Sequence, residues 1–306
     1  MNTTTTSERA RRALSSLSAL AVGDAFGSQF FVPDNRRFHR GRELPPGVWE
    51  WTDDTEMAAS VYLEVTRSGR VDPDRLAVSF AARHDFDRGY GPATGRLLRL
   101  VREGADHRPL ASGLFDGSGS WGNGAAMRVA PLGAHLADDV EAVAEQAAVS
   151  ARVTHTHPEA VDGAVAVAVA TALVGRGEAV APGPFLDRVA ATLPPGTLRE
   201  GVRVARSLLI VSDPVGAARE LGNGSRVRAL DTVPFALWVV AKHLRGTLAS
   251  ALWAAVAPGG DMDTVGAIVG GVLGAGVVGA VDPEWAARVE ALPEWALTRG
   301  HRRPAP

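Results

Sequence analysis

The chain has 306 residues, of which 46% are apolar, so it is long enough to bury a large hydrophobic core. Its 32 Lys and Arg nearly balance its 34 Asp and Glu, and a net charge of -2 gives no general basic excess of the kind that indicates a nucleic-acid or membrane partner. There is no cysteine, which excludes disulfides, thiolate metal sites and a cysteine nucleophile.

Neither end of the chain has the composition of a folded element or of a targeting segment. Residues 1–8 contain no basic start followed by a long apolar run, so we find no signal peptide and predict a disordered N-terminus. The tail 299–306 is predicted to be flexible. Between them, residues 9–298 contain no long linker and no repeated period, which favours a single domain. We expect a monomer in the cytoplasm, and the lack of cysteine is compatible with that compartment.

Signals for helices recur along the chain. Asp followed by Pro, a capping residue next to a proline at the first helical position, marks two of the expected helix starts. Three expected helices begin after Ser7, after Asp72-Pro73 and after Asp282-Pro283, and the first has Leu14, Leu17 and Ala21 on one face. Three more are expected over 138–152, from Thr156 to Val174 and over 233–257. Residues 164–170 (AVAVAVA) alternate as a buried strand would, but the length of the run and its alanine content favour a helix. We predict an all-α fold.

The apolar run 265–281 predicts a buried central helix. A membrane-spanning helix needs ~20 strongly apolar residues. This run is mostly Gly, Ala and Val, which gives it a weak tendency to enter lipid, and small residues suit close packing in a core. We therefore expect no membrane span.

Two adjacent carboxylates occur in the stretch Trp51-Thr52-Asp53-Asp54-Thr55-Glu56, where a helical pattern begins. Acidic residues are favoured in the first turn of a helix, where free N–H groups and the helix dipole stabilise negative charge. Taken alone, this stretch is explained by helix capping.

A second pair of carboxylates precedes the apolar helix, in Pro258-Gly259-Gly260-Asp261-Met262-Asp263-Thr264. Buried carboxylates need a counter-charge, and no Lys or Arg lies nearby in the sequence. Metal ions would supply that charge, and the two glycines would let the backbone turn sharply and approach a ligand closely.

Together the two stretches offer only hard oxygen ligands, which suit Mg²⁺ or Mn²⁺ rather than Zn²⁺. Two such ions ~3.5–4 Å apart can share an activated water and polarise a substrate oxygen. About two hundred residues separate the stretches, so their meeting in space is a prediction. The candidate ligands are Thr52, Asp53, Asp54, Asp261, Asp263 and Thr264.

Two further stretches combine glycine, polar residues and histidine. The loop 117–124 (GSGSWGNG) precedes a helical pattern and has the composition of a pyrophosphate cradle built from backbone N–H groups, or of a flexible surface loop. In Thr154-His155-Thr156-His157-Pro158, the two histidines do not share a helix face. Two roles are open for each histidine: a hydrogen bond to ribose or phosphate, or the capping of a helix.

In this order, these stretches resemble the ADP-ribosylglycohydrolase family, which includes the dinitrogenase reductase-activating glycohydrolase and the ADP-ribosyl-arginine and ADP-ribosyl-serine hydrolases. The resemblance spans roughly residues 10 to 280 and is carried by GDAFG (23–27), TDDT (52–55), SWGNGAAMR (120–128), THTHP (154–158) and GGDMDT (259–264). The two acidic stretches at opposite ends, with GNGAAMR between them, are specific in combination.

The resemblance implies a compact, single-domain, orthogonal bundle of helices with two Mg²⁺ or Mn²⁺ ions at one end of a cleft. By analogy, the six oxygen ligands named above hold the ions. The ADP-ribose site would be lined by Gly119, Ser120, Trp121, Gly122 and Asn123, and His155 or His157 would contact ribose or phosphate. The implied reaction is hydrolysis of the bond at ribose C1″, with a carboxylate assisting proton transfer.

Three positions depart from the family pattern. Phe31 stands where many members have a Glu, and in the serine-linked branch that Glu is catalytic. Ser120 stands where some members have an acid, and Met262 stands where a small polar residue is more usual. The customary acid or base is therefore missing. Candidate replacements are Glu56, Asp34, Glu43, or a metal-bound hydroxide held by Asp53 or Asp54, and our candidate catalytic residues are Asp53, Asp54 and Glu56.

The main hypothesis is a metal-dependent hydrolase of an ADP-ribosylated protein, nucleic acid or small ADP-ribose conjugate, with no strong nucleic-acid-binding patch. The alternative is a relative that binds ADP-ribose and metal without turnover, because Phe31 and Ser120 replace proton-transfer groups. A third hypothesis is a metal-dependent hydrolase with an unrelated substrate on the same scaffold. The aromatic segment 28–51 is explained by core packing, or by an apolar wall that faces the leaving group.

Overall fold

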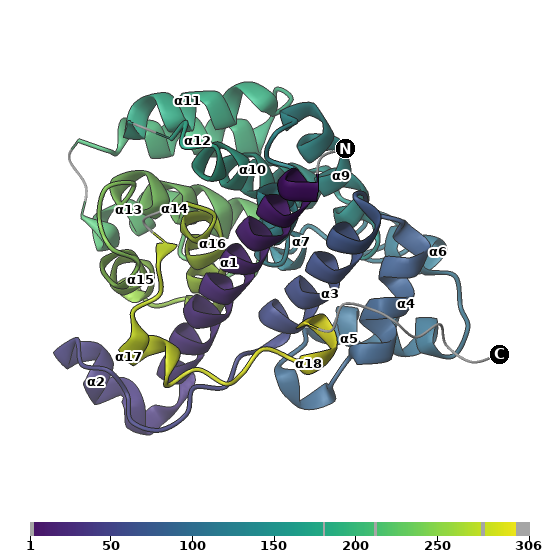
Figure 1. Ribbon diagram of the computed structural model, residues 1–306, viewed down its shortest axis with the longest axis horizontal. Helices are drawn as coiled ribbons and strands as arrows, with labels where there is room; N and C mark the ends of the chain where they lie inside the picture. The colour runs from purple at the N-terminus through teal and green to yellow at the C-terminus, as the bar shows by residue number, and fades with distance from the viewer. Residues whose placement is uncertain (1–2, 180, 211–212, 277–278, 298–306) are drawn as a thin grey trace.

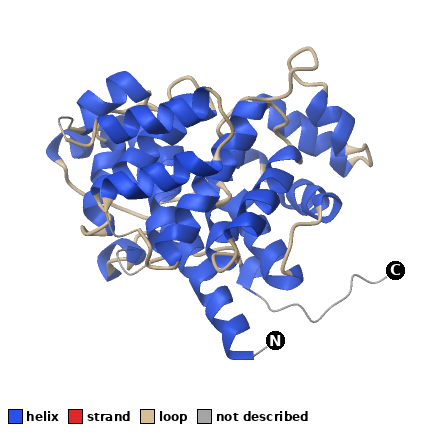
Figure 2. Ribbon diagram, turned by 90° about the horizontal axis from the view of Figure 1, so that it is seen from above, coloured by secondary structure: helices blue, strands red, loops and turns tan. Residues whose placement is uncertain are grey.

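Helices form nearly all of the regular structure (Figure 2). The structure, a computed structural model, describes residues 3–179, 181–210, 213–276 and 279–297. Within these ranges no strand is present, and β pairing is confined to two isolated bridges, Trp49 with Val289 and Gly122 with Arg228. The predicted all-α fold is confirmed.

The helices follow one another through short connections. Those of the first half of the chain are α1 (Thr3–Ser28), α2 (Arg36–Gly41), α3 (Asp53–Ser68), α4 (Pro73–Arg83), α5 (Pro92–Arg102), α6 (His107–Ser112), α7 (Gly124–Met127), α8 (Ala130–His135) and α9 (Val140–Arg152). Those of the second half are α10 (Pro158–Gly175), α11 (Pro182–Thr192), α12 (Thr197–Ser207), α13 (Pro214–Leu221), α14 (Ala229–Lys242), α15 (Leu248–Val256), α16 (Met262–Gly274), α17 (Pro283–Ala286) and α18 (Glu294–Leu297). Short 3-10 helices are η1 (Gln29–Phe31), η2 (Pro33–Asn35) and η3 (Phe86–Arg88).

Hydrogen bonds at the helix ends confirm several predicted starts. Asp72 caps α4 and Asp282 caps α17 through their side chains, in each case next to a proline in the first turn. His157 caps α10 in the same way, so one of the two predicted histidines has a capping role. Residues 164–170 lie inside α10, which confirms the helical interpretation of AVAVAVA.

Two predicted boundaries differ from the structure. Helix α1 begins at Thr3 rather than after Ser7, and so extends into the segment 1–8 that we expected to be disordered. The segment 233–257 is two helices, α14 and α15, because Thr247 forms a capping box that starts a new helix. The tail 299–306 lies outside the described residues, and its flexibility and the limits of the domain stay predictions.

Glycines bring α1 and α16 into contact along the middle of the fold (Figure 1). A methyl group placed on Gly23 would lie 2.0 Å from Gly266 O, and one on Gly27 would lie 2.2 Å from Met262 O. Only residues without a side chain permit so close an approach of two helix backbones. This contact fixes the C-terminal part of α1 against the first turn of α16.

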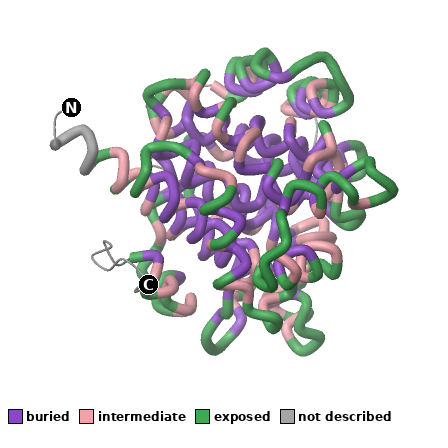
Figure 3. Tube along the Cα trace, turned by 90° about the vertical axis from the view of Figure 1, so that its right-hand side faces the viewer, coloured by how far each residue is buried: buried purple, intermediate pink, exposed green. Residues whose placement is uncertain are grey.

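The two most apolar helices lie inside the molecule. Helix α16 is buried over most of its length, as predicted for the run that starts at 265, although the helix ends at Gly274. Helix α10 has the length and composition to cross a membrane, but 83% of it is buried in the fold. Figure 3 shows such buried segments in the interior, with exposed loops and helix ends around them. Packing within the core accounts for the apolar character of both helices.

Candidate functional site

The first acidic stretch lies at the start of α3, where Asp24 of α1 holds it in place. The completely buried Asp24 accepts hydrogen bonds at Oδ2 from Thr52 N at 2.9 Å, Thr55 N at 3.0 Å and Thr55 Oγ1 at 2.6 Å, and at Oδ1 from Thr52 Oγ1 at 2.8 Å. The side chain of Thr52 caps α3 by accepting from Asp54 N. The carboxylates of Asp53 and Asp54 are therefore not needed as side-chain caps.

The second acidic stretch lies at the start of α16. Gly27 is so close to Met262 and Asp263 that the first turn of α16 rests directly on α1. Asp261 occupies the N-cap position of α16 but makes no capping hydrogen bond. Its Oδ2 instead accepts a hydrogen bond from Asn123 Nδ2 at 2.6 Å. Capping therefore does not explain this acid either.

Carboxylates from three helices converge at this place. Asp24 of α1, Asp54 of α3 and Asp263 of α16 each place an oxygen within 4.8 Å of the other two. Asp54 Oδ1 is buried and has no hydrogen-bond partner. Among the described residues, no Lys or Arg forms an ion pair with any of the three. The predicted meeting of the two acidic stretches is found, and we call this group the acidic cluster.

Burial makes these carboxylates resist ionisation. It raises the pKa of Asp24, and it raises the pKa of Asp54 and Asp263 well above the usual value. The charge of Asp24 adds to the rise for Asp54, and that of Asp261 adds to the rise for Asp263. Burial, followed by the charge of Asp24, also raises the pKa of Asp53 to about 8. Without added positive charge, such acids hold protons at pH values where exposed acids have lost them.

The chemistry of the donors fits a hard divalent cation. All six predicted ligands lie at the starts of α3 and α16, and each offers a carboxylate or hydroxyl oxygen, the ligand type that Mg²⁺ and Mn²⁺ prefer. The unpartnered Asp54 Oδ1 is a buried acceptor that a cation would satisfy.

A buried arginine supplies some of the positive charge near the cluster. Arg128 Nη2 donates to Ser150 O at 3.0 Å and to Thr154 Oγ1 at 2.9 Å. Burial lowers the pKa of Arg128 to about 9, and the charges of Tyr90 and Asp53 act in the opposite direction. The sequence around the acids contained no basic residue, but the fold brings this one within electrostatic range of Asp53.

Glu56, a third carboxylate of α3, is hydrogen-bonded to the loop 85–90. Its Oε2 accepts from the Tyr90 hydroxyl at 2.6 Å and from Asp85 N at 3.1 Å. Burial raises the pKa of Glu56, while the hydrogen bond from Tyr90 lowers it. In the same loop, a methyl group on Gly89 would lie 3.8 Å from Asp53 Oδ1. Glu56 therefore holds the loop beside Asp53.

The glycine-rich loop 117–124 packs against the segment 154–157. A methyl group on Gly119 would lie 2.0 Å from Thr156 Oγ1, and Gly119 has a φ of +72°, a conformation that favours glycine. The structure thus brings together two stretches that the sequence analysis had proposed separately.

Asn123 joins this loop to the acidic stretch of α16. Its Nδ2 donates to Asp261 Oδ2 at 2.6 Å and to Thr232 Oγ1 at 3.0 Å. Several backbone N–H groups of the loop are already bonded inside the protein, namely those of Ser118, Gly119, Gly122 and Asn123. Fewer N–H groups remain for a phosphate than the glycine content suggested.

Trp121 forms the aromatic part of the loop. Its ring centroid lies 4.7 Å from that of Phe115 and 5.8 Å from that of His157, and Arg228 lies 5.7 Å above the ring. Trp121 is partly exposed, whereas its neighbour Ser120 is buried. The Trp121 ring is therefore partly covered by Phe115 and Arg228 and partly open to solvent.

The two histidines lie next to the same loop. His155 is buried, its Nδ1 lies 2.7 Å from Thr154 Oγ1, and a methyl group on Gly124 would lie 2.9 Å from its Cε1. Burial lowers the pKa of His155 to about 3, so the ring is neutral at physiological pH. His157 uses Nδ1 to cap α10.

Comparison with known proteins identifies the family. The sequence model of the ADP-ribosylglycohydrolase family matches residues 5–303. The chain belongs to the ADP-ribosylglycohydrolase family. It is 31% identical to the Escherichia coli protein YegU, with 95% of each chain covered, and 27% identical to the ADP-ribosylhydrolase ARH3 of Gallus gallus, with 91% of this chain and 89% of the relative covered. A solved ADP-ribosylglycohydrolase-related protein complex matches with a TM-score of 0.66 and 28% identity, over 95% of this chain and 96% of that chain.

Asp24 is a residue of this ADP-ribosylglycohydrolase that the sequence analysis did not propose for the site. It belongs to the stretch GDAFG, which contributed to the resemblance, and its hydrogen bonds to Thr52 and Thr55 show that it positions the start of α3. A signal was present, because an aspartate between two glycines in an apolar helical stretch has no obvious way to reach water.

Phe31, which the family resemblance aligns with a Glu, is an exposed aromatic residue in this chain. The side chain of Phe31 is 49% exposed. Its neighbour Phe30 is buried and packs against Phe26 and Trp253, and Trp49 is fully buried. Core packing therefore explains Phe30 and Trp49 but not Phe31. The candidate acids Asp34 and Glu43 are both exposed.

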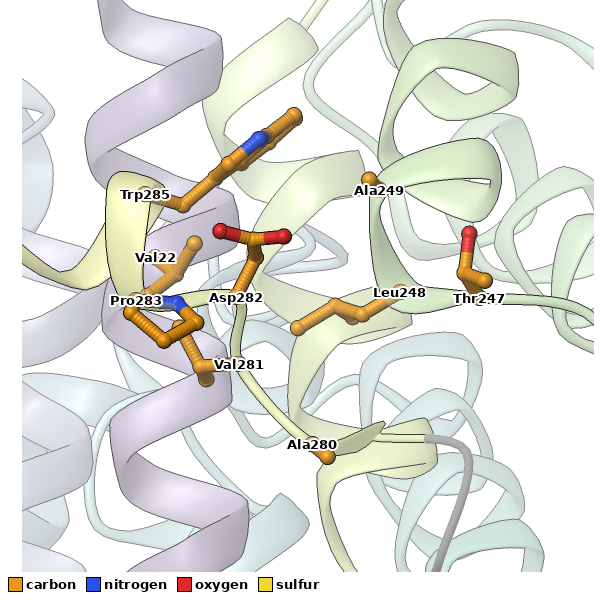
Figure 4. Close-up of a pocket in the computed structure, with 9 residues that line it drawn as sticks. All are labelled: Val22, Thr247, Leu248, Ala249, Ala280, Val281, Asp282, Pro283 and Trp285. Carbon is orange, nitrogen blue, oxygen red and sulfur yellow. The ribbon is translucent and has the colours of Figure 1, made fainter.

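A cavity of about 370 Å³ lies apart from the residues of this site (Figure 4). It is lined mainly by apolar side chains, and its one carboxylate, Asp282, caps α17. The lining residues are Val22, Thr247, Leu248, Ala249, Ala280, Val281, Asp282, Pro283 and Trp285. None of them is a predicted site residue, so this cavity does not carry the family's chemistry.

Proposed function

We propose that this chain is a hydrolase that cleaves the glycosidic bond at ribose C1″ of an ADP-ribosylated protein, nucleic acid or small conjugate, and that it uses two Mg²⁺ or Mn²⁺ ions. The observation that supports this most directly is the acidic cluster, in which the buried Asp24 and Asp54 meet the partly buried Asp263, and none of the three forms an ion pair within the described part of the chain. Such a group is costly to bury unless cations neutralise it. We also propose a cytoplasmic monomer without a membrane span.

The ions would be held by the six oxygen ligands at the starts of α3 and α16. When bound, divalent ions supply Lewis acidity and lower the pKa of a water. Asp24 fixes Thr52 and Thr55, and Asn123 fixes Asp261, so both helix starts are oriented before a substrate binds.

The proton-transfer group is best sought among the acids of α3. Glu56 is buried and accepts hydrogen bonds from Tyr90 and from Asp85 N in the loop 85–90, so we assign it a positioning role. Asp53 is the more exposed of the two adjacent acids, since Asp54 is buried. We therefore propose that the deprotonated Asp53 carboxylate accepts a proton from the attacking water.

The test is incubation of the purified protein with Mg²⁺ or Mn²⁺ and with arginine-, serine- and base-linked ADP-ribose conjugates. We expect release of ADP-ribose from at least one of them, and loss of that release on chelation of the metal. Binding of ADP-ribose without release from any conjugate would instead support the alternative of a non-catalytic relative. Absence of both binding and release would favour an unrelated substrate.

The ligands are tested by Asp54→Ala and Asp261→Ala. Each should lower both metal content and turnover, the latter by on the order of 10²-fold or more. Asp162→Asn is the matched control, because burial raises the pKa of Asp162 although it lies in α10, outside the acidic cluster. Unchanged metal content in either ligand variant would refute the assignment.

A further inference from the structure

A short arm that follows α1 carries a local excess of positive charge. We define the basic arm as residues 29–44, which contain η1, η2 and α2. Its sequence from Arg36 to Arg42 is RRFHRGR, so four arginines stand against two acids, Asp34 and Glu43, in the whole arm. The near balance of charge over the chain conceals this cluster.

The arginines of the basic arm are available to a partner. All four are exposed, and none forms an ion pair with a carboxylate in the described part of the chain. Arg36 and Arg40 lie four residues apart on α2, and therefore on one face of it. Arg37 lies 4.7 Å from the ring centroid of Phe38, and Arg42 lies 5.6 Å from that of Trp253.

The basic arm is anchored next to the acidic cluster. It begins directly after the end of α1, where Gly27 touches the backbone of Asp263. Phe30 packs on Phe26 with 5.0 Å between ring centroids, and His39 Nε2 donates to Val256 O at 2.9 Å, at the end of α15. In Figure 1, α2 projects at the corner beyond the C-terminal end of α1. The root of the basic arm therefore lies directly beside the helix ends that carry the acidic cluster.

The root of the arm adds an exposed apolar surface to these charges. Phe31 is 49% exposed and Val32 is 46% exposed. The basic arm thus combines an exposed aromatic ring with exposed arginines, and proteins bind single-stranded nucleic acid with these two groups, because bases stack on rings while arginines neutralise phosphates. An acidic peptide would match the charges but would offer no base to stack on Phe31.

We propose that the basic arm binds the phosphate backbone of a single-stranded nucleic acid that carries ADP-ribose, with Phe31 stacked on a base beside the modified nucleotide. This inference rests on the proposed function, because it names the carrier of the ADP-ribose cleaved at the same site. It also revises, for this segment, the expectation of no strong nucleic-acid-binding patch.

The first experiment measures binding and needs no turnover. A fluorescent single-stranded oligonucleotide is titrated with the full chain at several salt concentrations, and the same is done for Arg36→Ala/Arg40→Ala. Loss of two phosphate contacts should reduce the slope of log K against log salt by about 1.4 and weaken binding by on the order of tenfold or more at 0.1 M salt. The control Arg11→Ala/Arg96→Ala removes two arginines that are exposed and without an ion pair elsewhere, and should bind like the unaltered protein.

A second variant separates stacking from charge. Phe31→Leu keeps apolar bulk but removes the ring, and it should weaken oligonucleotide binding about fivefold without changing the salt slope. Equal binding by the arm variant, the control and the unaltered protein would overturn the proposal. So would an acidic peptide that binds as tightly as the oligonucleotide and responds equally to Arg36→Ala/Arg40→Ala.

Turnover then links the arm to the reaction. The ratio of kcat/KM for an ADP-ribosylated oligonucleotide to that for a small ADP-ribose conjugate should fall about tenfold in Arg36→Ala/Arg40→Ala. An unchanged ratio would contradict the role of the arm in substrate binding. If neither substrate is cleaved by the unaltered protein, the proposed function fails, and the binding experiment still decides whether the arm holds nucleic acid.

Discussion

The two halves of the acidic cluster are held in place by different means. At the start of α3, a side chain from another helix organises the turn, since Asp24 accepts hydrogen bonds from Thr52 and Thr55. At the start of α16, Asn123 donates a hydrogen bond to Asp261, and Thr264 N donates one to the neighbouring Asp263. This turn also rests on the backbone contact between Gly27 and Asp263. The start of α3 therefore depends on hydrogen bonds to a buried side chain, whereas the start of α16 depends also on a close backbone contact that only glycine permits.

This difference predicts two kinds of sensitivity. A change in the glycine contact should move a whole helix and affect stability as well as function. A change in the hydrogen-bond network should alter the orientation of one turn and affect metal binding more than stability. The following experiments test that division.

The largest expected effect is that of Gly27→Ala. The added methyl group would lie 2.2 Å from Met262 O and 2.6 Å from Asp263 Cα, and both are backbone atoms that can move only if the helices separate. We expect a loss of about 3 kcal/mol in the free energy of unfolding, measured by denaturant titration, together with loss of metal binding.

Gly91→Ala is the control for this change. A methyl group on Gly91 would meet nothing within 4 Å, and its φ of -59° suits any residue. If Gly27→Ala were as stable as Gly91→Ala and still bound metal, the backbone contact would not be what places Asp263.

The second effect distinguishes a positioning role of Asp24 from direct ligation. In Asp24→Asn, the amide oxygen can still accept the three hydrogen bonds that Oδ2 accepts from Thr52 and Thr55, so Mn²⁺ affinity measured by calorimetry should fall less than about tenfold. In Asp24→Ala those donors lose their acceptor, and affinity should fall by about 10- to 100-fold. Equal losses in the two variants would show that Asp24 itself binds metal.

Much of the site could be predicted from the sequence because its acids are adjacent in the chain. Asp53 and Asp54 stand together, as do Asp261 and Asp263, and the pairing of the two stretches needed only the family resemblance. The role of Asp24 could not be read in the same way, because its partners lie 28 and 31 residues away, at Thr52 and Thr55. Contacts that depend on how helices cross are not encoded in local spacing.

The same limit explains the errors in the fold. The helical pattern over 233–257 is continuous in apolar content, and the break between α14 and α15 depends on a local cap at Thr247. The sequence shows the glycines of GDAFG, but it does not show that they pack against the backbone of α16. The sequence pattern predicted which segments form helices, but the backbone contacts between those helices could be seen only in the structure.

The third effect concerns pH and metal together. The pKa of Asp53 is about 8 in the folded protein and 3.8 in an unperturbed group. Above about pH 5 the unfolded chain has lost this proton while the folded chain keeps it, so the metal-free protein should lose stability as pH rises toward 8. Buried His135 and His155, with pKa values of about 4 and 3, destabilise the fold only below about pH 6.5.

Thermal unfolding between pH 6.5 and 8.5 measures this effect. With a chelator, the melting temperature should fall with rising pH, and the slope should be smaller in Asp53→Asn. Added Mn²⁺ should reverse the trend, because metal binds the deprotonated acids, and at 100 times its Kd it adds about 2.7 kcal/mol. A melting temperature that rises with pH in the chelated protein would contradict the raised pKa.

The smallest expected effect is at Glu56, which shares α3 with the proposed ligands but is bonded to the loop 85–90. Glu56→Gln can still accept the hydrogen bonds from Tyr90 and Asp85, so kcat should change by less than about tenfold if Glu56 only positions the loop. A general acid or base would lose about 10²- to 10⁴-fold on the same change. Tyr90→Phe should likewise change kcat by less than about tenfold. A large loss of kcat in Glu56→Gln alone would identify Glu56 as the acid that takes the place of the Glu expected at position 31.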